Sequence, residues 1–181
     1  MAKHSTFISY YHKEDQYYKN MFDQLFQNIC INKSVMDGDI RTDLSTEYIK
    51  RLIRQDYISG SSVVVVLIGK HTYTRKHVDW EIAAGIGCYA RGCTGLVGIL
   101  LPTYPIYQQN HYNPDTIPAR LNDNVDSGYA KIYRWTEDTD KMKIYIDKAF
   151  ENRIYLKNKI DNSRRHFNNN RSIPVEVYRG N

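Results

Sequence analysis

The sequence predicts an α/β fold, in which helices cover both faces of a parallel sheet. The run Val63–Ile68 consists of six β-branched or leucine residues without polar alternation, which is typical of a strand buried on both faces. A second apolar run, Gly95–Leu101, follows it, and a stretch with helical periodicity lies between the two. The complete order is β-α-β-α-β-α-β-loop-β-α, which favours parallel strands joined by crossover helices.

In the first part of the chain, we expect a strand at Thr6–Tyr10 and a helix from Asp15, with Asp15 as its N-cap. The apolar positions of this helix recur at helical spacing: Tyr18, Met21, Phe22, Leu25, Phe26 and Ile29. A short second strand is expected at Ser34–Met36, and a second helix should begin near Asp43 or Ser45.

After the central strand, a helix is expected over Val78–Tyr89. Residues 102–128 contain four prolines and little periodicity, so we expect a long loop of the kind that often forms a lid or a binding loop. Lys131–Trp135 alternates polar and apolar residues like an edge strand, and a last helix should run from Thr139 to about Ile160.

At 181 residues, the chain is expected to form one domain over residues 1–162, followed by a frayed tail over 163–181. The formal charge is +5, and much of it lies in the tail, at Arg164, Arg165, Arg171 and Arg179. Because no basic helix face interleaved with aromatic residues occurs in the body, we expect no nucleic acid partner.

Neither a membrane location nor a disulfide framework is expected. No apolar run approaches the roughly 20 residues that span a bilayer, and the amino terminus lacks a signal-peptide core, so we expect a cytoplasmic protein. Cys30, Cys88 and Cys93 form an odd set in unrelated contexts, which favours buried thiols over disulfides. No set of cysteines and histidines completes a four-ligand zinc site, and we expect no metal.

Glu81 is the first candidate for chemistry. Ligands of open parallel sheets bind outside the carboxyl ends of the strands, and Glu81 lies near the start of the helix that follows the central strand. The sequences GxGxxG and GxxxxGK[ST] are both absent, which excludes the usual dinucleotide and nucleoside triphosphate loops. The third strand closes with Gly69 and Lys70 instead of an aspartate, which excludes a receiver domain.

Three stretches resemble a known family. They are Phe7-Ile8-Ser9-Tyr10 with a nearby acidic pair, the four-valine strand, and Ile68-Gly69-x-x-Thr72-Tyr73-x-Arg75-Lys76-x-Val78-x-Trp80-Glu81-Ile82. Over residues 5–150 the chain resembles bacterial TIR-like domains, above all the TIR-like sensor subunit of Thoeris anti-phage systems. This resemblance implies a flavodoxin-like, three-layer sandwich around a central five-stranded parallel sheet.

The resemblance also implies an activity. Enzymatic TIR domains break the bond between nicotinamide and ribose in NAD⁺ with a glutamate at the start of the third helix, a position that Glu81 occupies. NAD⁺ is then the substrate, and the product is ADP-ribose, a cyclic isomer or an adduct, made on phage infection to activate a separate effector protein. A phage component as trigger and self-assembly on activation are further implications. One departure is that His77 stands where the family usually has tryptophan, while Trp80 directly precedes the glutamate.

The substrate-binding candidates come from three places. The opening of the first strand supplies Ser9, Tyr10, Tyr11 and His12; the segment after the second strand supplies Asp37 and Arg41; the segment before Glu81 supplies Tyr73, His77 and Trp80. Each also has an ordinary explanation, since charged turn residues are usually solvated and Trp80 is well suited to pack on the sheet. Glu81 itself is also suited to a helix start, where the dipole favours a carboxylate.

Two other functions remain open from the sequence. The domain can act as an interaction module that assembles without turnover. It can also be an enzyme like the nucleoside deoxyribosyltransferases, in which a carboxylate such as Glu81 is the covalent nucleophile.

Overall fold

The computed structural model describes residues 3–33, 60–88, 92–105 and 111–173, and its core is a five-stranded parallel sheet. The strand order is β2-β1-β3-β4-β5, and all four neighbouring pairs run parallel. The strands are β1 (His4–Ser9), β2 (Cys30–Asn32), β3 (Val63–Ile68), β4 (Gly95–Leu100) and β5 (Lys131–Arg134). The predicted parallel sheet is confirmed, with the valine-rich run at its centre.

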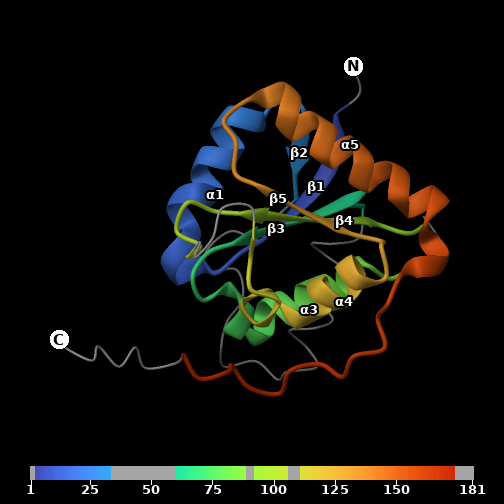
Figure 1. Ribbon diagram of the computed structural model, residues 1–181. Helices are drawn as coiled ribbons and strands as arrows, with labels where there is room; N and C mark the ends of the chain where they lie inside the picture. The colour runs from blue at the N-terminus through green and yellow to red at the C-terminus, as the bar shows by residue number, and fades with distance from the viewer. Residues whose placement is uncertain (1–2, 34–59, 89–91, 106–110, 174–181) are drawn as a thin grey trace.

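Helices cover both faces of this sheet (Figure 1), which confirms the three-layer arrangement. The α-helices are α1 (His12–Phe26), α3 (Lys76–Gly85), α4 (Ala119–Asp126) and α5 (Thr139–Tyr155). Three short 3₁₀ turns are η2 (Thr72–Thr74), η3 (Pro114–Thr116) and η4 (Lys157–Lys159). Helices α1 and α5 lie on one face, and α3 and α4 lie on the other.

The central strand β3 supplies side chains to both cores, because successive side chains of a strand point to opposite faces. Val64, Val66 and Ile68 are part of the core beneath α3 and α4. Val63, Val65 and Leu67 are part of the core beneath α1 and α5. All six side chains are fully buried, which explains why this strand shows no polar alternation.

Helix α5 approaches β4 closely at a glycine. A Cβ atom on Gly95 would lie 2.0 Å from the carbonyl oxygen of Ala149, so only glycine fits this position. The close approach fixes α5 across β4.

Several element boundaries differ from the prediction, most clearly those of the second strand and of α3. The second strand is Cys30–Asn32, three residues in register with the start of β1, instead of Ser34–Met36. The predicted strand residues 34–36 and the helix expected from Asp43 or Ser45 lie outside the described residues. Helix α3 begins at Lys76 and ends at Gly85, which is earlier at both ends than predicted.

The long loop expected over residues 102–128 contains a helix, α4. Its buried residues are Arg120, Leu121 and Asn124, two of which are polar. Arg120 and Asn124 satisfy their polar atoms through hydrogen bonds inside the fold. A helix whose buried side is mainly polar shows little apolar periodicity, so the sequence did not reveal it.

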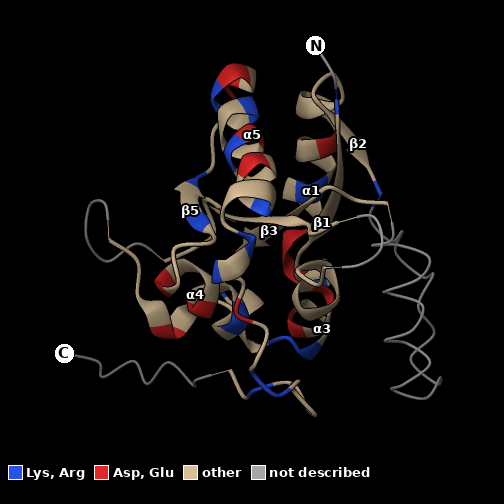
Figure 2. Ribbon diagram, turned by 90° about the vertical axis from the view of Figure 1, so that its right-hand side faces the viewer, with Lys and Arg blue, Asp and Glu red and all other residues tan. Residues whose placement is uncertain are grey.

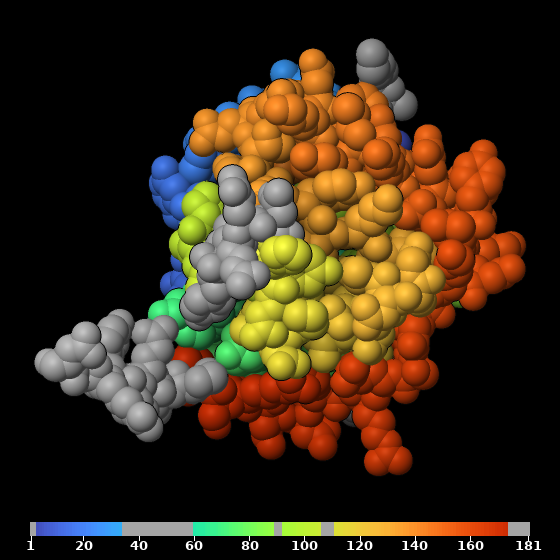
Figure 3. Space-filling view, viewed as in Figure 1, coloured from blue at the N-terminus to red at the C-terminus, as the bar shows by residue number. Residues whose placement is uncertain are grey.

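The first part of the expected tail is also ordered by contacts. Residues 161–171, here called the strap, run along α3 and α4, as the red segment at the bottom of Figures 1 and 3 shows. The Asn162 amide donates a hydrogen bond to the carbonyl of Ala83 in α3 (2.9 Å), and the Arg171 backbone N–H donates one to the carbonyl of Thr74 (2.8 Å). The expectation of a frayed tail is therefore wrong for residues 163–171 of the strap, whereas the division at residue 162 stays a prediction.

The cysteines differ from the expectation. Cys88 and Cys93 form a disulfide, although the sequence favoured thiols. Cys30 is a free, buried thiol, and burial raises its pKa to about 12. Cys30 is therefore an unreactive core residue.

Candidate functional site

The candidate site lies where β1 and β3 end side by side. From β1 the chain passes to the edge strand β2 and then returns to β3, so the strand order reverses between β1 and β3. Such a switch point is the usual ligand crevice of an open parallel sheet. Ser9, the last residue of β1, and Glu81, from the middle of α3, meet here: the Ser9 hydroxyl donates a hydrogen bond of 2.5 Å to Glu81 Oε2.

The fold explains why these two side chains meet. Ser9 follows Phe7 by two residues in β1, so both point toward the α3 face, where Phe7 is part of the core. On α3, Glu81 lies between the core residues Trp80 and Ile82. The carboxylate thus lies between the helix and the end of the strand.

Burial controls the charge of Glu81. Its exposed fraction is 4%, and this loss of water raises its pKa from 4.5 to about 8, against the opposite effect of the Ser9 hydrogen bond. At neutral pH, therefore, the Glu81 carboxyl group is protonated in most molecules that have this structure. A cation placed beside the carboxyl group would favour its ionised form.

The chain segments that carry this pair also carry basic and aromatic side chains, which contact one another. The guanidinium of Arg75, the residue before α3, lies 4.4 Å from the centre of the Tyr11 ring and donates a hydrogen bond of 3.3 Å to its hydroxyl. His77 lies with its ring 5.0 Å from the Trp80 ring. Burial, with smaller contributions from Lys76 and His12, lowers the pKa of His77, so its imidazole is neutral at physiological pH.

A second buried carboxylate lies at the carboxyl ends of β3 and β4. Asp15 has no exposed surface and accepts hydrogen bonds from the hydroxyls of Thr72 (3.1 Å) and Thr103 (3.3 Å). Burial raises its pKa to about 6. A Cβ atom on Gly69 would lie 2.2 Å from Asp15 Oδ1, so the glycine at the end of β3 makes room for this carboxylate. Asp15 lies in α1, which follows β1, and its hydrogen bonds connect this helix to the segments that follow β3 and β4.

Asp15 is therefore not the N-cap that we expected. Helix α1 begins at His12, with Tyr11 as the N-cap residue. The side chain of Asp15 points to the loops after β3 and β4 because their hydroxyls supply its hydrogen-bond donors.

The part of α3 before Glu81 is fastened to α4 and to the strap. The buried guanidinium of Arg120 donates a hydrogen bond of 3.0 Å to Asp79 Oδ1. The backbone N–H of Phe167 donates to Asp79 Oδ2 (2.9 Å), and the Trp80 indole N–H donates to the carbonyl of Phe167 (2.8 Å). The Asn170 side chain accepts a hydrogen bond of 2.9 Å from the first N–H of α3. The two residues before Glu81 are thus held in place on the side of α3 that carries the strap.

A sequence comparison identifies the family. Residues 7–105, more than half of the chain, match the family described as Thoeris protein ThsB, TIR-like domain. The chain belongs to this ThsB TIR-like family. The matched residues include the end of β1 and all of β3 and α3, and therefore both Ser9 and Glu81 of the candidate site.

Comparisons of the chain with solved structures and with curated proteins provide no further argument about its function. Among solved structures, the chain is similar to the TIR domains in the structure of the activated Roq1 resistosome directly recognizing the pathogen effector XopQ. The identity is 11%, the match covers 86% of this chain and 84% of that chain, and the TM-score is 0.40, which is too distant to carry a functional argument. A search among curated proteins finds no match.

The other predicted site residues of this ThsB-like chain lie at different places. Tyr10 points to the α1 and α5 face, opposite to Ser9, where its ring stacks on His12 at 4.2 Å and its hydroxyl donates to Gln16 (2.7 Å). Trp80 is buried in the core, as its alternative interpretation suggested, and half-buried Tyr73 lies in η2.

The predicted loop residues Asp37 and Arg41 lie outside the described residues. The structure thus brings Ser9 and Glu81 into direct contact, and Tyr11 and His77 belong to segments beside them. Within the described ranges, no group of three His, Cys, Asp or Glu side chains forms a metal site, and no helix is long and apolar enough to cross a membrane.

Sequence reasoning overlooked three residues that support the site. The sequence predicts Asp15 as a helix cap, and no local pattern marks Asp79 or Arg120. The ion pair of Asp79 and Arg120 joins residues 41 positions apart, which no local pattern reveals. For Asp15 a signal was present, since it belongs to the acidic pair after the first strand that forms part of the resemblance.

Proposed function

We propose that this ThsB-like TIR domain cleaves the bond between nicotinamide and ribose in NAD⁺ and makes an ADP-ribose-derived signal on phage infection. The observation that carries the proposal is the Ser9–Glu81 pair at the switch point of the sheet, within the residues that match the family. The product, a cyclic ADP-ribose isomer or an ADP-ribose adduct, would activate a separate effector protein. Self-assembly of the domain and a phage component as trigger belong to the same proposal.

The chemistry needs one carboxylate. When the bond between the nicotinamide nitrogen and C1′ of the ribose breaks, its electron pair leaves with the nitrogen, and nicotinamide departs as a neutral molecule without protonation. Positive charge then develops on the ribose. An ionised Glu81 that accepts hydrogen bonds from the ribose hydroxyls stabilises this charge as it appears. An acceptor then attacks C1′ and loses its proton: water gives ADP-ribose, and a group of the same molecule gives a cyclic isomer.

Substrate binding also supplies the ionised carboxylate. In the structure Glu81 is buried, and its pKa is about 8. The pyridinium ring of NAD⁺ carries a positive charge, so its approach lowers the pKa of Glu81 and releases the proton. Ser9 donates to the same carboxylate and favours its charged form. The neutral imidazole of His77 adds no competing positive charge beside the pyridinium.

A second candidate function is an interaction module that works by contact alone. Exposed apolar side chains on the last helix favour this alternative: Ile144, Ile154 and Tyr155 have exposed fractions of 49%, 53% and 79%. Tyrosine is enriched at protein interfaces, and exposed apolar patches often mark sites of association. This function would require neither Glu81 nor NAD⁺ turnover.

The test compares cells that express wild type, Glu81→Gln or Glu137→Gln, with and without phage infection. Glu137 is exposed and precedes α5, so its substitution is a control with the same chemical change. Nucleotides are followed by mass spectrometry. The proposal predicts a new ADP-ribosyl product after infection in wild type and in the Glu137 variant, and none in the Glu81 variant. Phage resistance that survives Glu81→Gln without any new nucleotide would establish the interaction module instead.

A further inference from the structure

Helix α3 cannot fix the position of Glu81 by itself. The helix has 10 residues, and a helix of this length is marginal in water without packing. Its last residue is Gly85, which lowers helix propensity, and its N-cap residue Arg75 forms no side-chain hydrogen bond to the first turn. The position of Glu81 therefore depends on the contacts that hold α3 from outside.

A buried ion pair connects α3 to α4. The side chains of Asp79 and Arg120 have exposed fractions of 4% and 0%, and Arg120 Nε donates a hydrogen bond of 3.0 Å to Asp79 Oδ1. The other guanidinium nitrogens donate to the strap, to Asn162 Oδ1 (2.7 Å) and to the carbonyl of Arg164 (2.8 Å). Figure 2 shows both helices below the sheet, with the strap beneath them. The rigid, planar guanidinium thus joins α3, α4 and the strap in one arrangement.

Stability alone does not explain this ion pair. Two charges lose their hydration on burial, and apolar side chains of similar volume are often at least as stabilising in such a place. The hydrogen bonds of the pair, however, restrict the distance and the angle between the two helices more tightly than apolar contacts do. The position of Asp79, two residues before Glu81, points to a role in the geometry of the site.

Asp79 and Glu81 lie on nearly opposite sides of α3, because two positions along an α-helix are about 200° apart around its axis. On one side, Asp79 binds Arg120 and the backbone N–H of Phe167 (2.9 Å). On the other side, Glu81 accepts the 2.5 Å hydrogen bond of Ser9. Such a hydrogen bond is lost when its two atoms move about 1 Å further apart. The contacts of Asp79 therefore control whether Glu81 reaches the end of β1.

We propose that Asp79 and Arg120 are positioning residues, which hold α3 so that Glu81 meets Ser9 and the ribose of NAD⁺. This inference rests on the function proposed above, and it adds α4 and the strap to the site. Both segments follow residues 7–105, which match the family. In this account neither residue contacts the substrate, and both act through the position of Glu81. A reacting group that is displaced by about 1 Å can lower a rate about 100-fold.

The test measures nicotinamide release in lysates of phage-infected cells over a range of NAD⁺ concentrations, per amount of soluble protein. The main variant combines Arg120→Met with Asp79→Leu, which replaces the ion pair by apolar side chains. The maximal rate should fall about tenfold or more, with a smaller change in KM, because the carboxylate acts in the transition state. Arg120→Lys keeps the charge without the planar group of donors; it is a milder second variant, and its maximal rate should fall about threefold or more.

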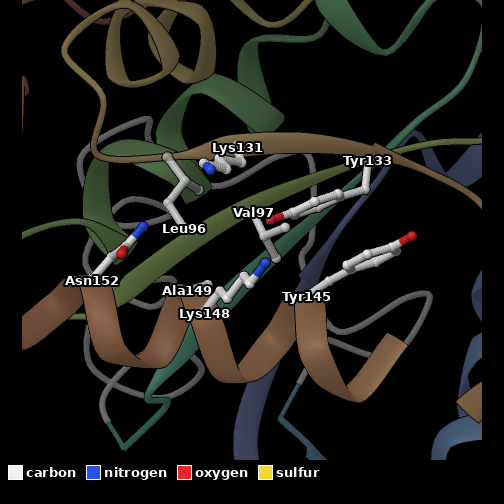
Figure 4. A pocket seen from close by; sticks show the side chains of 8 residues that line it. All are labelled: Leu96, Val97, Lys131, Tyr133, Tyr145, Lys148, Ala149 and Asn152. Carbon is white, nitrogen blue, oxygen red and sulfur yellow. The ribbon is translucent and has the colours of Figure 1, made fainter. Parts of the chain in front are cut away.

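Two controls remove a charge elsewhere. Asp123 of α4 accepts two hydrogen bonds of 2.6 Å from the Arg164 side chain of the strap, so Asp123→Asn weakens another ion pair between the same two segments. Lys148 lies on α5 and lines a cavity on the other face of the sheet (Figure 4), so Lys148→Met is a distant control. Both variants should release nicotinamide at about the wild-type rate.

The titration of Glu81 is a readout that needs no turnover. Its midpoint is followed by the ¹³C chemical shift of the carboxyl group in the purified chain. In wild type, burial raises the pKa of Glu81 to about 8. When α3 moves away from β1, water reaches this carboxyl group, so the midpoint should fall by about 1 pH unit or more in the double variant. The double variant loses one charge of each sign, so a change of net charge does not explain this shift.

The outcomes separate this inference from the proposed function. If the pair only stabilised the fold, the rate would recover together with the stability in the double variant. A wild-type rate in the folded double variant, or an unchanged midpoint of Glu81, would overturn the role of Asp79 and Arg120 and leave the proposed function intact. No release by any protein, wild type included, would overturn the proposed function, and the midpoint alone would then decide whether the pair positions Glu81.

Discussion

The protonation state of Glu81 leads to a quantitative prediction about stability. Between pH 4.5 and pH 8, the folded protein keeps the proton of Glu81, whereas the unfolded chain loses it. Unfolding therefore releases a proton, and the contribution of Glu81 to the free energy of unfolding falls as pH rises. Glu81→Gln has a similar shape and an acceptor oxygen for the Ser9 hydroxyl, but it does not titrate.

The magnitude follows from the two pKa values. With a pKa of 4.5 in the unfolded chain and about 8 in the fold, the stability of Glu81→Gln relative to wild type should rise by about 3–4 kcal/mol between pH 5 and pH 8. Asp15, whose pKa is raised to about 6, titrates in the same direction, but both proteins contain it and its effect cancels in the difference.

The assay is urea unfolding of both proteins at pH 5, 6, 7 and 8, with the free energies extrapolated to water. Ser9→Ala provides a companion test. Since the Ser9 hydrogen bond lowers the pKa of Glu81, its loss should make the stability of the protein fall more steeply with pH than in wild type. A difference between wild type and Glu81→Gln that stays constant from pH 5 to pH 8 would refute the assignment of a buried, protonated carboxyl group.

Two other predictions concern the supports of the site. Gly69→Ala places a Cβ atom against the Asp15 carboxylate and should lower the free energy of unfolding by about 1–3 kcal/mol in a urea titration. The same substitution in an Asp15→Ala background should lower it clearly less. Equal losses in both backgrounds would disprove the contact. Arg120→Met leaves Asp79 as an uncompensated buried charge and should lower the free energy of unfolding by about 3–5 kcal/mol, as measured by thermal unfolding. The additional change Asp79→Leu should restore part of this loss. A double variant less stable than the single variant would contradict this account of the pair.

Much of the fold was predictable because its signals are local. The run Val63–Ile68 has no polar alternation because both of its faces are buried, and this pattern is visible in the letters alone. Glu81 was found in the same way, from its position after this strand and from the residues around it. Its contact with Ser9 joins the two segments that the sequence had placed at the crevice.

The features that the sequence did not reveal depend on distant contacts. Asp15 resembles a helix cap until the hydroxyls of Thr72 and Thr103 are brought to it by the loops after β3 and β4. Helix α4 buries polar groups, such as Arg120, and the mostly exposed strap is held by hydrogen bonds to partners far along the chain. Hydrophobic periodicity cannot detect such segments, because hydrogen bonds instead of apolar side chains hold them in place.

The most direct test of the central claim, that Glu81 supports the cleavage of NAD⁺, is the release of nicotinamide. NAD⁺ labelled in its nicotinamide ring is added to lysates of phage-infected cells that express wild type, Glu81→Gln or Glu137→Gln, and free labelled nicotinamide is measured over time. We predict release with wild type and Glu137→Gln, and only the background of cells without the protein with Glu81→Gln. If all three proteins release nicotinamide equally and above that background, Glu81 is not the catalytic group. If none of them releases nicotinamide after an infection that the protein resists, this domain protects the cell without cleaving NAD⁺.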